Sequence, residues 1–494
     1  MPIPKGSPPT YNAFGWGPRE ARLLHDKLTR EIREGPSGPK VAAFFDVDRT
    51  LLAGFSAVSF MRERITSGRV GPTEFAQGLL GTLSFALGRT GFSGFVSAHT
   101  QAYRGLTEAS MDALGQEVFD KHLATQIFPE SRALVKAHRE RGHTIAIVSS
   151  ATPYQVDPVA RELGVEHVLC TRLEAQDGIL TGKVAHPTCF GRGKLLAAED
   201  LAEKLDLDLD ASYFYSDSID DLPLLENVGH PRPTNPDRRL AQIAKERRWP
   251  VQRFSSRGRP DLEQIGRTAL AYASLVPSAL AGAAVGLVNR SQREAVNMMG
   301  PLWADLSTAL AGVDLRVTGE EHLWSHRPAV FIFNHQSGLD ATLILKMVRR
   351  DVTGVAKQEI KRNPIFGPLF SAAGVVFIDR DDSKKAIEAL EPALEALRQG
   401  RSIAIAPEGT RQKTPRLGRF KKGAFHLAMQ AGVPIVPVVF RNVLDALPKD
   451  GIVIHPATIE AVVLPPIDTS SWTKATLDDE IEAIRNRFAE VLEG

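Results

Sequence analysis

The sequence has 494 residues, too many for one ordinary domain, because a domain takes roughly 150 residues. Hydrophobic residues make up 43% and charged residues 24%, which supplies packed cores and excludes wholesale disorder. The 60 basic and 58 acidic residues leave a net charge of +2, so nothing global attracts nucleic acid, and any attraction to phosphate or anionic membrane must come from local patches.

The two cysteines, Cys170 and Cys189, have no CxxC spacing and no metal-spaced histidine beside them. We therefore expect two unpaired thiols in a reducing compartment. The first residues, MPIPKGSPPTYNAFGWG, lack the apolar stretch of a signal peptide. Both observations indicate that the catalytic parts lie in the cytoplasm.

Residues 1–40 are interpreted as a leader, with a polar helix over 19–33 and a linker over 35–40. The first predicted domain covers 41–253. It opens with an apolar strand over 41–52, and further strands are predicted at 144–150, 167–170 and 212–217. Residues 55–140 have mainly helical periodicity. Strands that alternate with helices predict a parallel α/β sheet, with a helical cap over about 54–140 inserted after the first strand.

Asp46 and Asp48 stand at the end of the first strand, in the segment DVDRT. The carboxyl ends of parallel strands are where ligands bind, and unpaired carboxylates beside a core are costly without a function. One carboxylate can attack phosphorus while the other acts as acid and base. Mg²⁺ prefers oxygen ligands and would offset the charge of such a cluster.

Polar groups follow at the later strand ends in the order that phosphoryl transfer needs. Ser149 ends the second strand, and its hydroxyl could hold a phosphate oxygen. Lys194 opens a helix and could neutralise the phosphate. The segment YSDSIDD adds Asp217, Asp220 and Asp221 as candidate metal ligands.

The segments DVDRT and IVSS, the lysine Lys194, and the segment YSDSIDD resemble the four motifs of the haloacid dehalogenase superfamily, in particular its phosphoserine-phosphatase-like, subfamily IB members. The resemblance covers about 41–253 and implies a Rossmann-like sheet with a helical cap. It also implies Asp46 as nucleophile, Asp48 as general acid and base, and Ser149 and Lys194 as phosphate ligands. Magnesium would be held by Asp46, Asp48, Asp217 and Asp221. The sequence departs from the family at Ser216, where glycine is usual, and at Asp220, where asparagine is common.

Residues 254–312 are predicted to be a linker and an apolar helical segment. From 268 to 289 there is no charged residue, a length close to the ~20 residues of a membrane span. Alanine, glycine and serine dominate, and Pro277 interrupts the run. We predict a kinked helical hairpin seated in the membrane surface, and a buried core helix is the alternative.

A second α/β pattern occupies 313–494, with strands expected at 329–335, 352–357, 374–379, 402–409 and 433–440. The first of these ends in NHQSGLD, which contains His335 and Asp340. A histidine base needs a carboxylate that fixes its tautomer and stabilises the imidazolium. Such a pair can take a proton from a substrate alcohol, which suits direct acyl transfer from a thioester.

Basic residues gather after the later strands. Arg380 follows one strand, and Glu408, Gly409 and Arg411 follow the next. Arg380 and Arg411 could grip a phosphate. The run RLGRFKKGAF, which contains Arg416, Arg419, Lys421 and Lys422, either meets anionic headgroups, at ~1 kcal/mol per charge, or forms a solvated loop.

The segments NHQSGLD, GVVFIDR, PEGTR and VPIVPV resemble the four motifs of the lysophosphatidic acid acyltransferase family, the glycerolipid acyltransferases, over about 300–470. The resemblance implies His335 as base, Asp340 as its partner, Arg380 and Arg411 as ligands of the glycerol phosphate, and Glu408 at the acceptor glycerol. The backbone at Gly409 would bind acceptor or donor. The implied donor is acyl-CoA or acyl-carrier protein, and the implied acceptor is a lysophospholipid.

The sequence therefore predicts a bifunctional enzyme at the cytoplasmic face of the membrane, peripheral or shallowly inserted. Its C-terminal domain would convert 1-acylglycerol 3-phosphate to phosphatidic acid, and its N-terminal domain would be a magnesium-dependent phosphomonoesterase. The phosphatase substrate stays open between a lipid phosphate and a small phosphoserine-type molecule, and a non-catalytic regulatory module is a further alternative. An apolar cap segment, residues 78–95, could admit a lipid chain or simply pack within the cap. The oligomeric state is not predicted.

Overall fold

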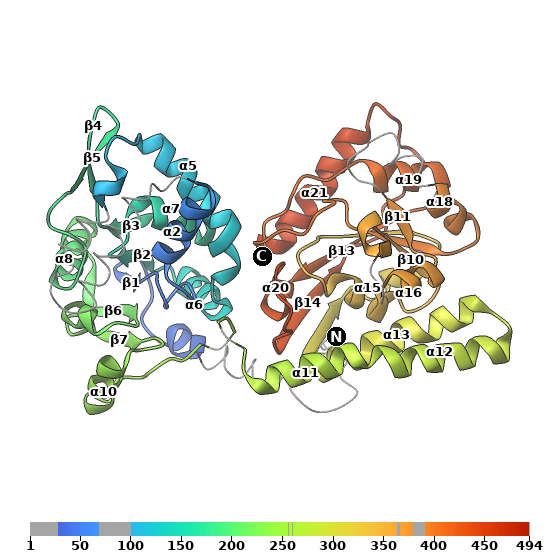
Figure 1. Ribbon diagram of the computed structural model, residues 1–494, viewed down its shortest axis with the longest axis horizontal. Coiled ribbons are helices and arrows are strands. Elements are labelled where there is room, and N and C mark those ends of the chain that lie inside the picture. The colour runs from blue at the N-terminus through green and yellow to red at the C-terminus, as the bar shows by residue number, and fades with distance from the viewer. Residues whose placement is uncertain are drawn as a thin grey trace, which may run out of the picture. The chain divides into compact units, whose positions relative to one another are not determined.

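The computed structural model describes residues 28–68, 100–254, 256–258, 260–362, 366–378 and 391–493. The chain forms two compact units, one ending at Arg259 and the other beginning at Pro260 (Figure 1). Arg380, cap residues 78–95 and most of the predicted leader helix lie outside the described residues, and residues 28–34 of that leader are helical.

The N-terminal unit is built on a five-stranded parallel sheet with the order β3-β2-β1-β6-β7. Ala43 and Phe45 on the central strand face one hydrophobic core, while Ala42 and Phe44 face a second. Burial on both faces explains why this strand is apolar throughout. The strands are β1 (Val41–Phe45), β2 (Thr144–Ser149), β3 (His167–Cys170), β6 (Asp208–Ser216) and β7 (His230–Pro233). The predicted α/β fold class is confirmed.

The first strand is shorter than predicted. It ends at Phe45 rather than at residue 52, because the chain folds into a turn there. The amides of Leu51 and Leu52 both donate to the carbonyl of Val47 at 2.9 Å, and Arg49 has a positive φ of 58°. This turn brings Asp48 back beside the end of the strand.

Helices cover the sheet, and further elements form the cap. The helices α6 (Pro129–Glu140), α7 (Pro153–Leu163), α8 (Arg192–Leu205), α9 (Leu222–Leu225) and α10 (Arg238–Glu246) follow strands or precede them. The elements before α6 are α2 (Ser56–Thr66), η1 (Gln101–Tyr103), α5 (Glu108–Val118), the π-helical η2 (Phe119–Leu123) and η3 (Ala124–Gln126). A short η4 (Ile219–Asp221) follows β6.

A two-stranded hairpin, β4 (Leu173–Gln176) with β5 (Ile179–Val184), was not predicted. Its turn residues Asp177 and Gly178 have positive φ values of 52° and 74°. Asp-Gly is a favoured pair for such a turn, so the signal was present in the sequence.

The C-terminal unit begins with three helices, α11 (Leu262–Ala273), α12 (Leu275–Asn289) and α13 (Gln292–Ala311). Figure 1 shows α12 and α13 side by side as a hairpin, and the two are in extensive contact. The prediction that residues 268–289 alone form the hairpin was wrong. The turn lies at Arg290, which is left-handed, and Ser291, which caps α13. Pro277 lies in the first turn of α12, where its missing N–H costs nothing.

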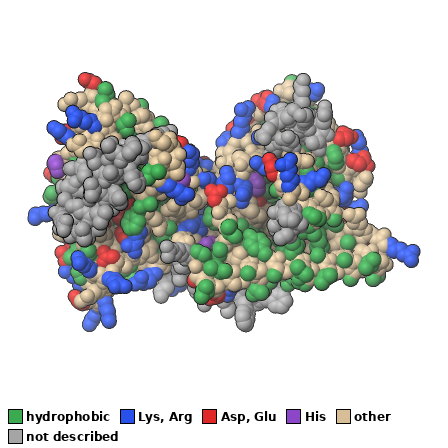
Figure 2. Space-filling view, viewed as in Figure 1, with side chains coloured by type: hydrophobic (Ala, Val, Ile, Leu, Met, Phe, Trp, Pro, Cys, Tyr) green, Lys and Arg blue, Asp and Glu red, His purple; other side chains and the backbone are tan. Residues whose placement is uncertain are grey.

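Much of this helical segment is apolar and exposed. Among the described residues, one helical stretch, Leu262–Asn289, is long and apolar enough to cross a membrane, and only 22% of its most hydrophobic window is buried. The alternative of a buried core helix therefore fails. Figure 2 shows hydrophobic side chains along these helices, and the most exposed are Leu262, Val276, Leu280, Leu287 and Val288.

A seven-stranded sheet with the order β11-β10-β12-β9-β13-β14-β8 forms the core of the C-terminal unit. All neighbours are parallel except β13 and β14. The strands are β8 (Val313–Thr318), β9 (Val330–Phe333), β10 (Val352–Lys357), β11 (Val376–Ile378), β12 (Ser402–Ile405), β13 (Ile435–Arg441) and β14 (Ala457–Val463). The strands β8 and β14 were not predicted.

The remaining helices of this unit are α14 (His322–Ser325), α15 (Asp340–Val348), η5 (Gln358–Arg362), α16 (Phe366–Ala372), α18 (Glu391–Arg398), α19 (Gly423–Ala431), α20 (Val443–Ala446) and α21 (Leu477–Glu493).

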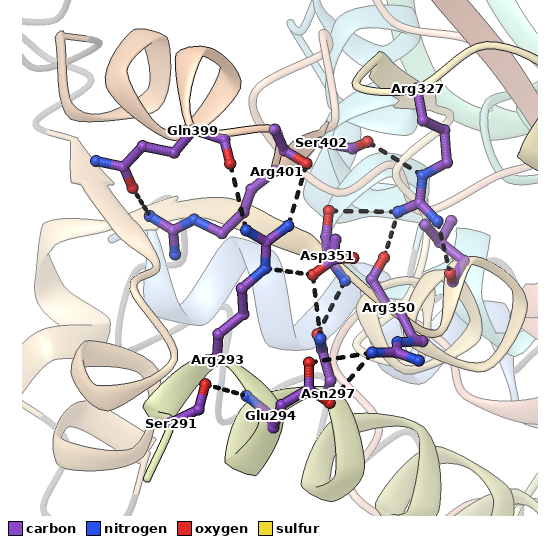
Figure 3. A network of polar contacts seen from close by, with 12 residues as sticks. Ser291, Arg293, Glu294, Asn297, Arg327, Arg350, Asp351, Gln399, Arg401 and Ser402 are labelled. Carbon is purple, nitrogen blue, oxygen red and sulfur yellow. Dashed lines mark hydrogen bonds and ion pairs between the residues drawn. The ribbon is translucent and has the colours of Figure 1, made fainter. Parts of the chain in front are cut away.

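Polar contacts fasten α13 to the body of the C-terminal unit. Asp351, which precedes β10, accepts hydrogen bonds from Arg293 at 2.6 Å and from Asn297 at 3.0 Å (Figure 3). Farther along α13, Asp305 pairs with Lys346 at 2.9 Å and with Arg349 at 3.0 Å. Lys346 belongs to α15, the helix that begins at Asp340, so the hairpin is joined directly to an element of the predicted site.

Candidate active sites

In the N-terminal unit, a buried lysine joins two of the predicted carboxylates. The ammonium of Lys194, near the start of α8, lies 2.8 Å from Asp46 Oδ1 and 2.8 Å from Asp221 Oδ2. Ser216, the departure from the family motif, donates its hydroxyl to the same oxygen of Asp221 at 2.5 Å. Asp221 is therefore occupied in holding Lys194. Among the described residues, none donates a hydrogen bond to Asp46 Oδ2.

Asp48 and Ser149 flank this pair at the ends of β1 and β2. The amide of Ser56 donates to Asp48 Oδ1 at 2.8 Å and its hydroxyl donates to Oδ2 at 3.2 Å. Ser56 was missed by the sequence analysis, because nothing in its spacing distinguishes it from other serines at a helix start. Ser149 is buried, and its hydroxyl accepts a hydrogen bond from the amide of Ala151 at 3.2 Å.

Burial governs the titration of these carboxyls. It raises the pKa of Asp46 to about 7, despite the opposing charge of Lys194. It also raises the pKa of Asp48, against the hydrogen bonds from Ser56. Burial would lower the pKa of Lys194, but Asp221 and Asp46 raise it well above its ordinary value. The raised pKa of Asp48 favours its protonated form, which is the form that a general acid needs.

Asp217 supplies the carboxylate that a metal ion would need next to Asp46. Burial and then the charge of Asp46 raise the pKa of Asp217 to about 8, and Arg49 lies 3.1 Å from its Oδ2. The described residues contain no group of three or more His, Cys, Asp or Glu side chains arranged to hold a metal. Two carboxylates nevertheless fit Mg²⁺, which commonly binds one or two and fills its other positions with water and substrate phosphate.

The second site stands at the carboxyl edge of the seven-stranded sheet. His335 follows β9, and its Nδ1 lies 2.8 Å from Asp340 Oδ2, at the start of α15. Asp340 is fully buried, whereas the His335 side chain is 24% exposed. With Nδ1 held by the carboxylate, Nε2 is the ring nitrogen left to act as a base.

Backbone amides complete the environment of Asp340. The amides of Gln336 and Ser337 both donate to Asp340 Oδ2 at 2.9 Å. The turn from strand to helix thus fixes Oδ2 of Asp340 against the imidazole ring. Asn334, which the sequence analysis missed, bonds through its side-chain amide to both the carbonyl and the amide of Phe440 on β13. The sequence signal that could have identified Asn334 is its position directly before His335 in the segment NHQSGLD.

Glu408 lies against the backbone of the site. Its Oε1 accepts from the amide of His335 at 2.8 Å, and its Oε2 accepts from the amide of Gly418 at 2.7 Å. The carboxyl is buried, and burial raises its pKa against those two hydrogen bonds. The amide of Gln412 in turn donates to the carbonyl of His335 at 2.7 Å. This geometry makes Glu408 a positioning residue for His335.

The other predicted ligands lie around the same loop. Gly409 has a positive φ of 73°, and a Cβ there would come within 3.0 Å of the Lys421 side chain. Arg411 lies close to the histidine turn, since a Cβ on Gly338 would be 3.8 Å from its Nη1. In the basic run, Lys422 pairs with Asp478. Arg380 lies outside the described residues, so its role as a ligand of the glycerol phosphate stays a prediction.

Comparisons with known proteins match the two sites to two families. The haloacid dehalogenase-like hydrolase family matches residues 43–226, and a family described as acyltransferase matches residues 314–441. A probable phosphatase of Mycobacterium tuberculosis is 35% identical over 231 residues, which are 44% of this chain and 76% of the relative. A phosphoserine phosphatase of the same organism is 34% identical over 270 residues, 53% of this chain and 84% of the relative. The 1-acyl-sn-glycerol-3-phosphate acyltransferase of Limnanthes douglasii is 33% identical over 193 residues, 39% of this chain and 68% of the relative.

Proposed function

The chain belongs to the haloacid dehalogenase-like hydrolases through its N-terminal unit and to the 1-acyl-sn-glycerol-3-phosphate acyltransferase family through its C-terminal unit, and on that premise we propose what each unit acts on. The C-terminal unit transfers an acyl chain from a thioester, either acyl-CoA or acyl-carrier protein, to 1-acylglycerol 3-phosphate. The product is phosphatidic acid. The observation that carries this proposal is the His335–Asp340 pair with Arg411 beside it.

The geometry supports a direct transfer without an acyl-enzyme. Nε2 of His335 takes the proton from the acceptor hydroxyl as the oxygen attacks the thioester carbonyl. The carbon–oxygen bond forms, the carbon–sulfur bond breaks, and the proton passes from His335 to the departing thiolate. Asp340 stabilises the imidazolium while it exists. Glu408 and the turn amides keep the ring in place throughout.

The exposed helices supply a reason to place this reaction at a membrane. The acceptor is a lipid, and the apolar surface of α11 and α12 is the kind of surface that enters the boundary of a bilayer. We propose that the protein sits on the cytoplasmic face of the membrane, with this helical segment shallowly inserted.

The N-terminal unit hydrolyses a phosphomonoester in two steps. A carboxylate oxygen of Asp46 attacks phosphorus, and Asp48 gives a proton to the departing alcohol. Asp48 then takes a proton from the water that hydrolyses the aspartyl-phosphate. Lys194 and Ser149 would hold the phosphate oxygens. Magnesium, held by Asp46 and Asp217, would supply positive charge that draws the phosphate toward Asp46.

The relatives favour a small phosphorylated molecule as the phosphatase substrate, since one of them is named a phosphoserine phosphatase. Fusion to a lipid enzyme favours a lipid phosphate instead, including the phosphatidic acid made by the other unit. We propose the small molecule as the first candidate. The small-molecule proposal is supported if the protein releases phosphate from O-phosphoserine but not from phosphatidic acid, and if this release depends on both Mg²⁺ and Asp46. Release from phosphatidic acid but not from O-phosphoserine would favour the lipid phosphate as the substrate.

Product analysis by mass spectrometry tests the acyltransferase. Purified full-length protein is given mixed lysophospholipids with acyl-CoA or acyl-carrier protein as donor. We expect phosphatidic acid from the wild type and from Asp46→Asn, and none from His335→Ala. Transfer that survives His335→Ala in a folded protein would overturn the assigned base.

A further inference from the structure

A group of cations lies at the edge of the acyltransferase site, and one of them lies beyond the residues matched to the acyltransferase family. Lys357 ends β10, Arg411 and Lys413 follow β12, and Lys449 follows α20. The match to the acyltransferase family ends at residue 441, so Lys449 has no role assigned by it. These residues come from three separate segments of the chain.

The loop that carries Lys449 is anchored to the histidine turn. Ser337, two residues after His335, donates its hydroxyl to the carbonyl of Leu447 at 2.7 Å. A Cβ on Gly338 would lie 3.5 Å from Leu447 Cδ2 and 3.8 Å from Arg411 Nη1. The turn that positions the base therefore touches both the Arg411 loop and the loop of residues 447–451.

The described residues place one carboxylate, Asp450, against the four cations of this group. Lys413 lies 3.3 Å from Asp450. In the part of the chain that the structure describes, no carboxylate forms an ion pair with Lys357, Arg411 or Lys449. Burial and then the charge of Lys413 lower the pKa of Lys449, Asp450 opposes this, and Arg411 and Lys357 add to the lowering. Four cations from three segments against one carboxylate leave a net positive charge, which suits an anionic ligand.

Burial differs within the group. Lys449, Arg411 and Lys413 are all partly buried, with some of each residue packed against protein. Lys357 is exposed, as are Lys421 and Lys422, but the last two are neighbours on a single stretch of chain. Cations that approach from separate loops instead match the several oxygens of one phosphate group.

We propose that Lys449, together with Arg411, Lys413 and Lys357, binds a substrate phosphate beside His335. The inference rests on the proposed acyl transfer and deepens it by adding Lys449 to the binding site. The ligand is a phosphate monoester dianion. Both the headgroup of the lysophospholipid acceptor and the 3′-phosphate of acyl-CoA have this chemistry, so the experiment must separate them.

Steady-state kinetics of the full-length protein provide the test. Lys449→Met is compared with Lys474→Met, an exposed lysine of the same unit that lies outside this group, and with Lys449→Arg. KM is measured for acceptor and donor separately. A lost charge-assisted contact raises KM about 10-fold. We expect that rise in Lys449→Met for one substrate, with kcat within about 2-fold, near-normal values in Lys449→Arg and no change in Lys474→Met.

The outcomes separate this inference from the proposed function. A KM rise for the acceptor alone assigns the headgroup phosphate, and a rise for acyl-CoA alone assigns the donor phosphate. Unchanged KM values for both substrates would overturn the inference while acyl transfer stands. If the wild type makes no product, calorimetric binding of 1-acylglycerol 3-phosphate and of CoA decides instead: a Kd about 10-fold higher in Lys449→Met for either ligand supports the site, and equal Kd values for both reject it.

Discussion

The two sites hold their acids in different ways. In the N-terminal unit, side-chain cations stabilise the carboxylates, since Lys194 bridges Asp46 and Asp221 and Arg49 reaches Asp217. In the C-terminal unit, backbone amides stabilise the carboxyl groups, because Asp340 and Glu408 accept their hydrogen bonds largely from the main chain. The first arrangement depends on charged side chains that a single substitution can remove. The second depends on the conformation of a turn and a loop.

The difference fits the charge that each reaction brings. A phosphomonoester adds negative charge to a site that is already rich in carboxylates, so mobile side-chain and metal cations must offset it. Acyl transfer needs one histidine held in a fixed orientation, which a rigid backbone frame achieves with little added charge. The predictions below test this contrast, beginning with the largest expected effect.

Replacing Lys194 with methionine should damage both the activity and the stability of the N-terminal unit. The change leaves Asp46 and Asp221 as buried carboxylates without their cation, which costs about 3–5 kcal/mol. We expect phosphatase turnover to fall at least about 10³-fold, with acyl transfer unchanged. Phosphate release, acyl transfer and calorimetric unfolding are measured on one sample. A loss of acyl transfer in this variant would contradict the expectation that the damage stays within the N-terminal unit.

Asp340→Asn tests the acid held by backbone amides. Asparagine keeps the shape of the side chain but loses the charge that selects the histidine tautomer, a change that costs a serine protease triad about 10⁴-fold. We expect a fall in kcat for acyl transfer approaching that size, with the unfolding temperature changed little. Phosphate release serves as the internal control, and a drop in that activity would indicate general misfolding.

Glu408→Gln separates a positioning role from direct contact with the acceptor. One amide oxygen can still accept from His335, but the amide nitrogen would face the N–H of Gly418. We expect kcat to fall about 10- to 100-fold while the acceptor KM stays within about 2-fold. A raised acceptor KM at unchanged kcat would instead show that Glu408 binds the acceptor glycerol, as the family resemblance implied.

The smallest effect concerns pH and a histidine cluster beneath the phosphatase sheet. His138 is fully buried, 2.8 Å from His143 and 2.9 Å from the hydroxyl of Tyr215. Burial, followed by the charges of His143, Arg232 and His230, lowers its pKa well below the ordinary 6.5. The unfolded chain therefore binds the proton first, so stability is present above pH 6.5 and is lost as pH falls further.

Calorimetry of the full-length protein between pH 7 and 5 measures this loss. The unfolding temperature of the N-terminal unit should fall with decreasing pH, and the fall should be shallower in His138→Gln. An identical pH slope in the variant would show that other groups control acid unfolding.

Residue pattern predicted which candidate side chains would meet more accurately than it predicted the elements around them. Asp46, Lys194, His335 and Asp340 were recognised from apolar runs and motif spacing, and the structure places Asp46 beside Lys194 and His335 beside Asp340. Their partners Ser56 and Gly418 were not, since hydrogen bonds between distant segments leave no local pattern. The acceptor-binding role that the family resemblance implied for Glu408 stays a prediction, and its contacts with two backbone amides add a positioning role.

The missed elements have physical explanations too. Strand β14 alternates between buried and half-buried residues, so it lacks the continuous apolar run by which the central strands were recognised. The hairpin turn at Arg290 and Ser291 lies outside the uncharged run of residues 268–289. Composition identified the apolar helix, but the partner helix α13 contains charges and was not recognised.

The contacts of Asp305 with Lys346 and Arg349 have a mechanical consequence. These ion pairs join the helix that starts at Asp340 to the helical hairpin, so a displacement of the hairpin would be transmitted toward the turn that holds His335. If the hairpin rests in a bilayer, its immersion depth sets the height of His335 above the lipid. The depth to which the hairpin enters the membrane surface would then influence which acceptor hydroxyls reach the base.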